Sequence, residues 1–321
     1  ILFALIKKSD VILHNFRAGV VDRLGLDYDS VRAINPSIVY TVISGFGAKG
    51  PRSADPAYDG AVQAAAGMMA NNGTAESGPL RTGYMPVDLM TGMTAAYATT
   101  AALLRKQKTG KGQMVDVAML DCAITLGSAN FSRSEVDDIP DMLIGNQSIT
   151  SAPTASSFPT AEGAILTAAI MPNHVEAFFD EIGLKEMLND PKFATREARI
   201  ENKEIVRDAM IEALKSDTAE NWEKRLAPRG VPVAKINSVK ETARLEQLQY
   251  RNILTAVPAA KGMANGYRLP GAPFTNSEDG PEVMRPAPVL GQHTLEILEE
   301  IGIDKSVINT LAAEGVICKA D

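Results

Sequence analysis

Histidine and cysteine, the side chains that most often bind metals or act as bases and nucleophiles, are few and far apart in this chain. The histidines are His14, His174 and His293, and the cysteines are Cys122 and Cys318. No pair has the H-x-x-x-H spacing of a helical metal site, and two cysteines cannot build a disulfide framework or a Cys-rich zinc site. We therefore expect chemistry without a metal, in a protein of the reducing cytoplasm.

Two glycine-rich segments resemble phosphate-binding loops but lack the surrounding elements. Residues 45–50 match G-x-G-x-x-G after a predicted strand. A dinucleotide site needs a helix that starts within the motif, whereas Pro51 and Pro56 follow here and the next predicted helix starts near Tyr58. Residues 110–112, Gly-Lys-Gly, lack the spacing of a Walker loop. Both segments predict loops rather than nucleotide sites.

Composition narrows the class of protein further. The chain has 321 residues, of which 45% are hydrophobic and 22% charged, with a net charge of −7. This is ordinary globular composition at a length that suggests two domains. The negative charge argues against general nucleic-acid binding but allows a small anion held by a local cluster of Arg and Lys. No apolar run approaches the ~20 residues of a membrane span, so no membrane association is expected.

The elements that must position any site alternate between strands and helices in the first part of the chain. Strands are predicted over 11–14, 38–44 and 113–119, and helices from Asp27 or Asp29 to Ile34 and over 58–70, 90–108 and 120–131. This alternation favours a parallel α/β sheet. The helix predicted over 90–108 carries its larger apolar residues on one stripe: Met90, Met93, Tyr97, Thr100 and Leu104.

A change in composition divides the chain. We predict a large α/β domain over 1–135, a linker over 136–157, a smaller α+β domain over 158–250, and a linker with a return to the large domain over 251–321. The chain also opens with helical spacing at its first residues, directly before the first predicted strand. We expect further sequence to precede such a start.

Short motifs run along the whole chain in a recognisable order. They include residues 9–11 (Ser-Asp-Val), 15–19 (Asn-Phe-Arg-Ala-Gly), 34–36 (Ile-Asn-Pro), 58–59 (Tyr-Asp), 86–88 (Pro-Val-Asp), 109–113 (Thr-Gly-Lys-Gly-Gln), 158–161 (Phe-Pro-Thr-Ala) and 287–294 (Ala-Pro-Val-Leu-Gly-Gln-His-Thr). Together they resemble family III CoA-transferases of the CaiB/BaiF type, the group that contains formyl-CoA transferase. Relative to that family, an N-terminal segment with part of the CoA site is absent. The resemblance implies a Rossmann-like large domain, a small α+β domain and an interlocked homodimer.

The resemblance also implies that Asp88 is catalytic. In this family such an aspartate attacks an acyl-CoA and forms a mixed anhydride, and the released CoA thiolate converts it to an aspartyl-CoA thioester. A free carboxylic acid then takes up the CoA, in a reaction of the class that transfers sulfur-containing groups. CoA and acyl-CoA are substrates here, and no permanently bound cofactor is implied.

Physical chemistry allows two roles for Asp88. Covalent catalysis by a carboxylate divides a difficult acyl exchange into easier steps, and the positive end of a helix that starts near Met90 should keep Asp88 ionised. Spacing alone favours a simpler role, the N-cap of that helix, which Asp fills often. The resemblance favours catalysis, and the two roles can coexist.

Six other residues match family positions at the site. The resemblance places Asn15, Phe16 and Arg23 at the nucleotide portion of CoA, with Phe16 able to stack on adenine and Arg17 and Arg23 able to meet phosphates. The alternative for this segment is a solvated turn. Tyr58 and Asp59 match positions that line the active site, although Tyr58 alone could be a core residue.

One departure and two alternatives accompany the resemblance. Residues 145–151 stand where formyl-CoA transferase has a glycine-rich loop, so neither formate nor oxalate is implied, and the acyl donor and acceptor acid stay open. A racemase acting on α-methylacyl-CoA would need a His where Tyr58 stands, and tyrosine, with a pKa near ~10, is a poor base at neutral pH. The other alternative is an inactive CoA-binding fragment.

Overall fold

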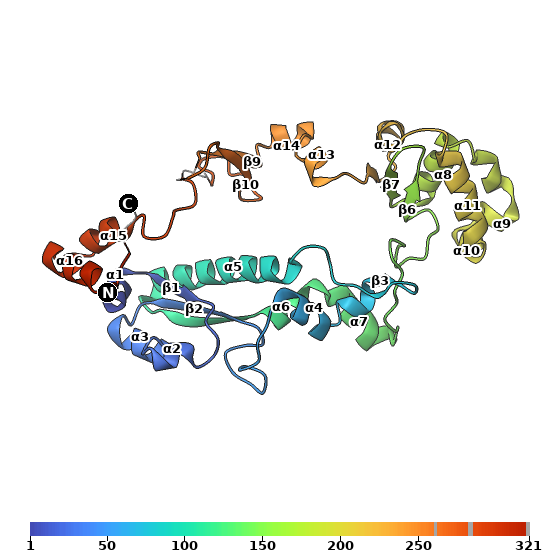
Figure 1. Cartoon of the computed structure of the whole chain (residues 1–321). Helices are drawn as coiled ribbons and strands as arrows, with labels where there is room; N and C mark the ends of the chain where they lie inside the picture. The colour runs from blue at the N-terminus through green and yellow to red at the C-terminus, as the bar shows by residue number, and fades with distance from the viewer. Residues whose placement is uncertain (260–261, 282–284, 319–321) are drawn as a thin grey trace. The chain divides into compact units, whose positions relative to one another are not determined.

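The chain forms two units in the computed structural model, and each is described by itself (Figure 1). The structure describes residues 1–259, 262–281 and 285–318. Unit 1 comprises Ile1–Gly145 and Leu295–Ala313, and unit 2 comprises Asn146–Thr294 and Glu314–Asp321. The division into two domains and two linkers, over 1–135, 136–157, 158–250 and 251–321, stays a prediction.

A three-stranded parallel sheet lies at the centre of unit 1. Its strands follow the order β1-β2-β5 and are β1 (Val11–His14), β2 (Val39–Ser44) and β5 (Gln113–Ala118). Val39 at the start of β2 pairs with both Val11 and Gln113, so the three strands begin together. Their carboxyl ends therefore point to the same side of the sheet. The parallel sheet predicted from the sequence is confirmed.

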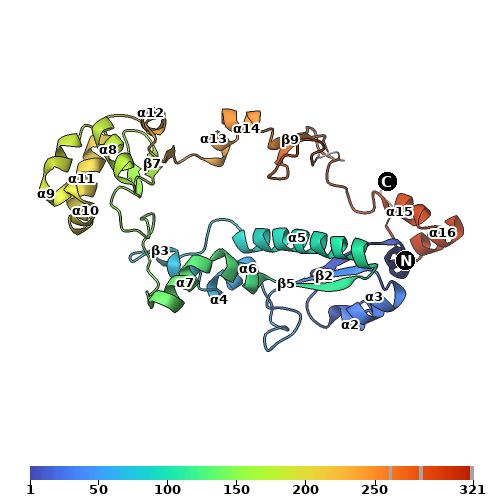
Figure 2. The same cartoon turned by 180° about the vertical axis from the view of Figure 1, so that it is seen from behind.

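Helices cover both faces of this sheet (Figures 1 and 2), with α5 along one face and α2 and α3 against the other. The helices of unit 1 are α1 (Leu2–Lys8), α2 (Val20–Arg23), α3 (Tyr28–Ile34), α4 (Asp59–Ala65), α5 (Pro86–Thr109), α6 (Met119–Leu126), α7 (Ser128–Asp137), α15 (Thr294–Glu300) and α16 (Lys305–Ala313). A 3-10 turn (Met69–Asn71) and a short strand pair, β3 (Gly73–Thr74) and β4 (Gly78–Pro79), lie between α4 and α5.

Side chains of β2 alternate between the two helical layers, because successive residues of a strand point to opposite faces. Tyr40 and Val42 pack in one hydrophobic cluster with Val31 of α3. On the other face, the hydroxyl of Thr41 lies 2.7 Å from that of Thr99 on α5. This alternation makes β2 the buried centre of an α/β/α arrangement.

The limits of three predicted helices are wrong. The helix predicted over 58–70 ends at Ala65, and a separate 3-10 turn follows at Met69–Asn71. The helix predicted to start near Met90 begins at Pro86, a residue suited to the first turn because its missing N–H needs no partner there. The helix predicted over 120–131 is two helices, α6 and α7, separated at Gly127. The early start of α5 places Asp88 inside the first turn, not before it.

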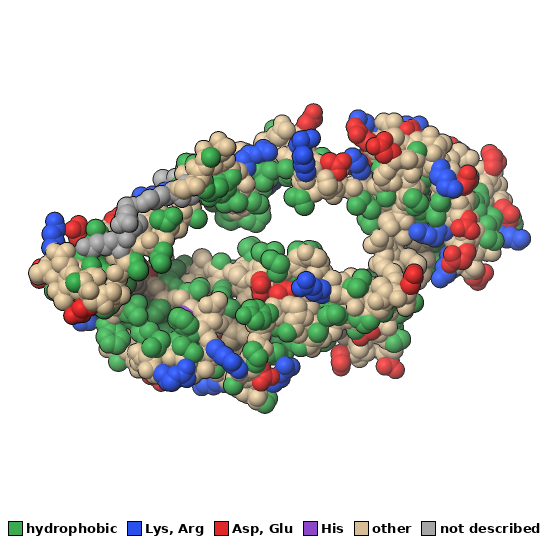
Figure 3. Space-filling view, viewed as in Figure 1, with side chains coloured by type: hydrophobic (Ala, Val, Ile, Leu, Met, Phe, Trp, Pro, Cys, Tyr) green, Lys and Arg blue, Asp and Glu red, His purple; other side chains and the backbone are tan. Residues whose placement is uncertain are grey.

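Most of the larger apolar side chains of α5 face away from the sheet, although Met90 packs with Val117 of β5 in a hydrophobic cluster. The buried residues of this helix are mostly small: Val87, Thr91, Ala95 and Ala102. In contrast, Met93, Tyr97 and Leu104 of the predicted stripe are 57%, 67% and 53% exposed. Figure 3 shows hydrophobic side chains on the surface over α5. Small residues let the helix approach the sheet closely, which leaves the apolar stripe on the surface of unit 1.

Unit 2 contains an antiparallel sheet packed with helices. The sheet has the order β6-β7-β8, with β6 (Ser157–Pro159), β7 (Ala164–Thr167) and β8 (Val233–Lys235). The surrounding helices are α8 (Pro172–Glu181), α9 (Pro191–Ala194), α10 (Arg196–Glu201), α11 (Lys203–Leu214) and α12 (Ala219–Leu226). Phe158, Phe178 and Trp222 are buried in its core, where the Trp222 indole N–H donates to the Leu214 carbonyl at 2.9 Å.

The remaining chain of unit 2 holds short elements that the sequence did not predict. They are α13 (Val239–Thr242), α14 (Glu246–Tyr250), and an antiparallel hairpin of β9 (Leu254–Val257) and β10 (Tyr267–Pro270). Gly and Pro are frequent in this region, so its periodicity is weak. Among the described helices of the chain, none combines the length and apolar character that crossing a membrane requires.

We predict that Gly112→Ala destabilises unit 1. A Cβ atom at Gly112 would lie 1.9 Å from the carbonyl oxygen of Ile38, a backbone atom that cannot move aside without disturbing β2. We expect a loss of about 3 kcal/mol in the free energy of unfolding, measured by urea denaturation with circular dichroism.

Gly83→Ala is the matched control for this change, since a Cβ there meets nothing within 4 Å. The fluorescence of Trp222, which is buried in unit 2, reports the other unit in the same samples. Equal unfolding midpoints for the two variants would show that the approach of Gly112 to β2 does not matter.

Candidate active site

A cavity of 650 Å³ lies at the carboxyl ends of the three parallel strands of unit 1. The chain leaves each strand into its wall, at Asn15 after β1, at Gly45 after β2 and at Met119 after β5. The first turns of α5 supply Asp88 and Gly92. Ligands of open parallel α/β sheets bind in this position. The fold therefore supplies a site of the right size for part of a large substrate.

Asp88 is an exposed residue in the first turn of α5, and it lines the cavity. The N-cap of this helix is Met85, so the alternative in which Asp88 is the N-cap is wrong. An acidic residue in the first turn interacts favourably with the helix dipole. The side chain of Asp88 is thus held at a helix terminus without being used to cap it.

A second carboxylate, Asp59, supports the backbone of that turn. Asp59 is the first residue of α4 and is only 7% exposed. Its Oδ2 accepts hydrogen bonds from the backbone N–H groups of Val87 at 2.9 Å and of Asp88 at 3.1 Å. Helix termini leave such donors without partners in the helix. Asp59 therefore caps α5 from a neighbouring helix and lies behind Asp88, rather than on the cavity wall.

The pKa of Asp88 is raised from its ordinary value of 3.8. Desolvation by the surrounding protein is the larger cause, and the negative charge of Asp59 is the second. Asp59 also occupies N–H groups of the helix terminus that would otherwise be free to stabilise the charge of Asp88. A carboxylate of raised pKa is a stronger base and a stronger nucleophile once ionised.

The loop after β1 brings three predicted residues to the cavity. Asn15, Phe16 and Arg17 line it, and the Phe16 ring is half exposed. The Arg17 guanidinium donates to the carbonyl of Ala54 from Nε at 3.0 Å and from Nη2 at 2.6 Å. Arg17 thereby joins this loop to the segment that leads to Tyr58.

The other two predicted residues, Tyr58 and Arg23, differ in their position relative to the cavity. Tyr58 is the N-cap residue of α4, is 84% exposed and lines the cavity, so its alternative as a core residue is wrong. Arg23 is exposed at the end of α2 and is not part of the cavity wall. The structure therefore brings Asn15, Phe16, Arg17, Tyr58 and Asp88 together around one space, with Asp59 beneath and Arg23 outside.

A hydrogen-bonded chain from His14 fixes the loop that carries Phe16. The Tyr40 hydroxyl donates to the Leu26 carbonyl at 2.8 Å, so it accepts from His14 Nε2–H, also at 2.8 Å. His14 Nδ1 is then an acceptor, and the backbone N–H of Phe16 donates to it at 3.2 Å. This arrangement requires neutral His14. Burial lowers the pKa of His14, which favours the neutral form. Burial also raises the pKa of Tyr40 to about 12, and the charges of nearby acidic residues contribute less to this shift.

Met119 and Gly92 also line the cavity, although the sequence did not single them out. Met119 directly follows β5, as Asn15 follows β1, and the first residues after parallel strands meet at one edge of a sheet. Gly92 lies one helical turn beyond Asp88, and space around it is open, with nothing within 4 Å of a Cβ there. A side chain at Gly92 would enter the space in front of Asp88.

No cluster of three or more His, Cys, Asp or Glu side chains suited to a metal ion occurs among the residues that the structure describes. The chemistry of the cavity is that of two carboxylates, Asp55 and Asp88, an exposed aromatic ring, a phenol and a guanidinium. Such a set can hold a nucleotide-bearing substrate and form a covalent acyl bond to a carboxylate.

Comparison with known proteins finds a family model, relatives and solved structures that are similar to this chain. The model of CoA-transferase family III matches residues 1–294. An acyl-CoA transferase of Fusarium pseudograminearum is 31% identical over 320 residues, covering 99% of this chain and 69% of the relative. A succinate–glutarate CoA-transferase of Agrobacterium fabrum is 30% identical, covering 92% of this chain and 74% of the relative. The crystal structure of a CaiB/BaiF family protein from Brucella suis has a TM-score of 0.82 at 26% identity, covering 94% of this chain and 77% of that one.

We predict that the stability of unit 1 falls as His14 becomes protonated. A histidine whose pKa is lower in the folded than in the unfolded chain binds fewer protons when folded, so stability is complete above the ordinary pKa of 6.5 and falls as the pH drops through and below that value. Protonated Nδ1 cannot accept from Phe16, and we expect a loss of ~1 kcal/mol, the usual contribution of one hydrogen bond.

The measurement is urea unfolding from pH 5 to pH 7.5 of the wild-type chain and of His14→Gln, which has no ring to protonate. Because the two proteins differ only at residue 14, the difference between their pH profiles isolates His14. Identical pH profiles for the two proteins would contradict the role of this hydrogen-bonded chain.

Proposed function

The chain belongs to CoA-transferase family III and is a CoA-transferase, and we propose that Asp88 carries CoA from an acyl-CoA donor to a free carboxylic acid. The observation that supports this role is the exposed carboxylate of Asp88, of raised pKa, on the wall of the 650 Å³ cavity. Relatives named for succinate, glutarate and oxalate transfer also act between a CoA thioester and an acid. A screen of acyl-CoA donors against small carboxylic acids would identify the donor and the acceptor that this chain uses.

The proposed reaction divides the transfer into balanced steps. An Asp88 oxygen attacks the thioester carbonyl, the carbon–sulfur bond breaks, and CoA thiolate leaves behind a mixed anhydride. The thiolate attacks the aspartyl carbonyl, which releases the donor acid and forms an aspartyl-CoA thioester. The acceptor carboxylate attacks this thioester, thiolate leaves, and a second anhydride forms. Attack of thiolate on the acceptor carbonyl gives the new acyl-CoA and restores Asp88.

The environment of Asp88 suits these steps. Desolvation and the charge of Asp59 raise its pKa, which increases the nucleophilicity of the ionised carboxylate. Gly92 leaves the approach to the carboxylate open. The carboxylate lies in the first turn of α5, at the cavity formed where the parallel strands end, the usual position of ligands in open α/β sheets.

We propose that the loop after β1 binds CoA. Phe16, half exposed on the cavity wall, offers a face for adenine, and Asn15 offers hydrogen-bonding groups beside it. The Arg17 guanidinium is oriented by the Ala54 carbonyl, and Arg17 and the exposed Arg23 supply positive charge for phosphates. Tyr58 and Asp59 complete the site, at the cavity wall and beneath Asp88.

Racemisation is not favoured. It needs a base beside the carboxylate, and Tyr58 occupies the position where the resemblance places a racemase histidine. The relatives described above are named as CoA-transferases. An inactive CoA-binding fragment is the remaining alternative, and the first experiment below separates it from an active enzyme.

We propose that a second copy of the chain covers the exposed apolar stripe of α5. Met93, Tyr97 and Leu104 are each more than half exposed, and Leu89 is 63% exposed on the same side of the helix. A continuous exposed apolar surface of this kind is typical of an interface. The interlocked homodimer that the resemblance implies would bury it.

We predict that Asp88→Ala abolishes transfer. Removing the carboxylate removes the group that forms both covalent intermediates, so we expect kcat to fall by ~10³-fold or more while CoA still binds. In the wild-type chain, hydroxylamine added during turnover should convert Asp88 to a hydroxamate, which peptide mass spectrometry detects.

Calorimetric titration of CoA into both proteins is the control for binding. Retained turnover in Asp88→Ala would discredit the assignment. Exchange of the substrate α-proton in heavy water, without a trapped aspartate, would favour racemisation. CoA binding with neither reaction would identify an inactive fragment.

We predict that paired substitutions Met93→Lys and Tyr97→Lys weaken self-association. Two charges in the centre of an apolar interface cost several kcal/mol, so we expect the dissociation constant to rise by ~100-fold or more. Sedimentation velocity over a range of concentrations measures it. Val239→Lys, at an exposed apolar position of unit 2, is the matched control, and an unchanged dimer in the α5 variant would mean that another surface mediates association.

A further inference from the structure

Gln63 on α4 is a buried polar residue that the proposed reaction does not use. Gln63 is only 1% exposed. The amide nitrogen donates to Asp59 Oδ1 at 2.5 Å and to the Thr82 hydroxyl at 3.0 Å. The amide oxygen accepts from the Thr82 backbone N–H at 3.0 Å. Every donor and acceptor of this amide is therefore directed at one of two residues.

These two residues both control the first turn of α5. Asp59 uses Oδ1 for Gln63 and Oδ2 for the backbone N–H groups of Val87 and Asp88. Thr82 belongs to the segment that leads into α5, and its hydroxyl donates to the Tyr84 carbonyl at 2.9 Å. Gln63 thus sets the rotation of the Asp59 carboxylate and holds the segment that enters the helix.

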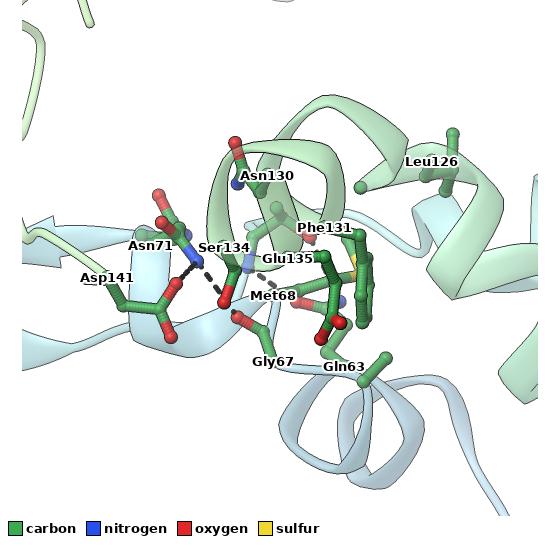
Figure 4. Close-up of a pocket in the computed structure, with 14 residues that line it drawn as sticks. Gln63, Gly67, Met68, Asn71, Leu126, Asn130, Phe131, Ser134, Glu135 and Asp141 are labelled. Carbon is green, nitrogen blue, oxygen red and sulfur yellow. Dashed lines mark hydrogen bonds between the residues drawn. The ribbon is translucent and has the colours of Figure 1, made fainter. Parts of the chain in front are cut away.

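Gln63 does not line the cavity that contains Asp88. It lies instead on the wall of a neighbouring cavity of 390 Å³, together with Asn71, Phe131 and Asp141 (Figure 4). In that cavity the Asn71 amide donates to Asp141 at 2.6 Å and to the Gly67 carbonyl, and the wall holds no Lys or Arg. Gln63 therefore does not contact a substrate that is bound in the cavity of Asp88.

We infer that Gln63 is a positioning residue for Asp88, acting through Asp59 and Thr82. This inference rests on the proposed function of Asp88. With the Gln63 amide in place, the Asp59 carboxylate cannot rotate without losing a hydrogen bond, and the Asp88 backbone stays anchored. Without it, Asp59 can turn away from the helix terminus, and the Asp88 side chain loses its fixed approach to the thioester. Small displacements of a reacting group reduce rates strongly.

The inference predicts a selective kinetic defect in Gln63→Leu, which keeps the size of the side chain and removes its hydrogen bonds. We expect kcat to fall by about 10- to 100-fold, the scale of a displacement of about 1 Å, with little change in KM for acyl-CoA. The acid limb of the kcat profile should move to lower pH, because a displaced Asp59 raises the pKa of Asp88 less. The other charged or titratable groups facing this cavity are Arg17, Asp55 and Tyr58.

Val62→Ala is the matched control. Val62 is the preceding residue of α4, is fully buried and packs in the hydrophobic cluster beside α6, without taking part in the hydrogen bonds described here. It should lower stability without moving the acid limb. Thr82→Val, which keeps the backbone N–H but removes the hydroxyl, should give a defect of the same kind as Gln63→Leu and a smaller one.

A second readout does not depend on catalysis. Amide hydrogen exchange at Val87 and Asp88 should accelerate by at least about 10-fold in Gln63→Leu and not in Val62→Ala, since Asp59 protects these amides. Unchanged exchange there, or wild-type kcat with an unmoved acid limb in Gln63→Leu, would overturn the role of Gln63. Failure to trap Asp88 in the wild-type chain would instead overturn the proposed function itself.

Discussion

The candidate site depends on one electrostatic contact, between the buried carboxylate of Asp59 and the first backbone N–H groups of α5. A helix terminus has donors without partners, and burying them unsatisfied would be costly. Asp59 satisfies two of them from another helix. The side chain of Asp88 in the same turn is therefore not needed as a cap, and it remains exposed on the cavity wall. One carboxylate has a structural role, and this leaves the other available for chemistry.

The same contact contributes to the unusual electrostatics of the turn. A helix N-terminus normally favours a nearby negative charge, yet Asp88 has a raised pKa. Desolvation by the surrounding protein is the larger reason, and the negative charge of Asp59, which also occupies N–H groups of this terminus, is the second. The burial of Asp59 and its bond to Gln63 keep that charge in place. In the proposed reaction this favours attack on a thioester by a carboxylate that would be a weak nucleophile in water.

The parallel sheet and α5 each position a different part of the site. Because three strands end at the same edge, the loops after β1, β2 and β5 meet at one cavity, although they are far apart in the sequence. Small residues on the inner side of α5 allow it to lie close to the sheet, which brings Asp88 to that edge. The cost is an outer side of α5 with large apolar residues exposed, a surface that a second copy of the chain is proposed to cover.

Much of this fold follows from local patterns in the sequence. The strand over 38–44 and the helix from Asp27 or Asp29 to Ile34 were readable, because each depends on neighbouring residues, and the structure shows that Asp27 is the cap of α3. The motifs around Asn15, Tyr58 and Asp88 were readable too, as a family resemblance. By itself, the sequence therefore determined the class of fold, the family and the residue types of the site. Only the tertiary structure decided that α5 starts at Pro86, that its large side chains face outward and that Asp59 and Gln63 lie behind Asp88. These features depend on contacts between residues far apart in the sequence, 19 residues for Gln63 and Thr82, 28 for Asp59 and Val87 and 58 for Thr41 and Thr99. Such contacts leave no periodic trace in either segment.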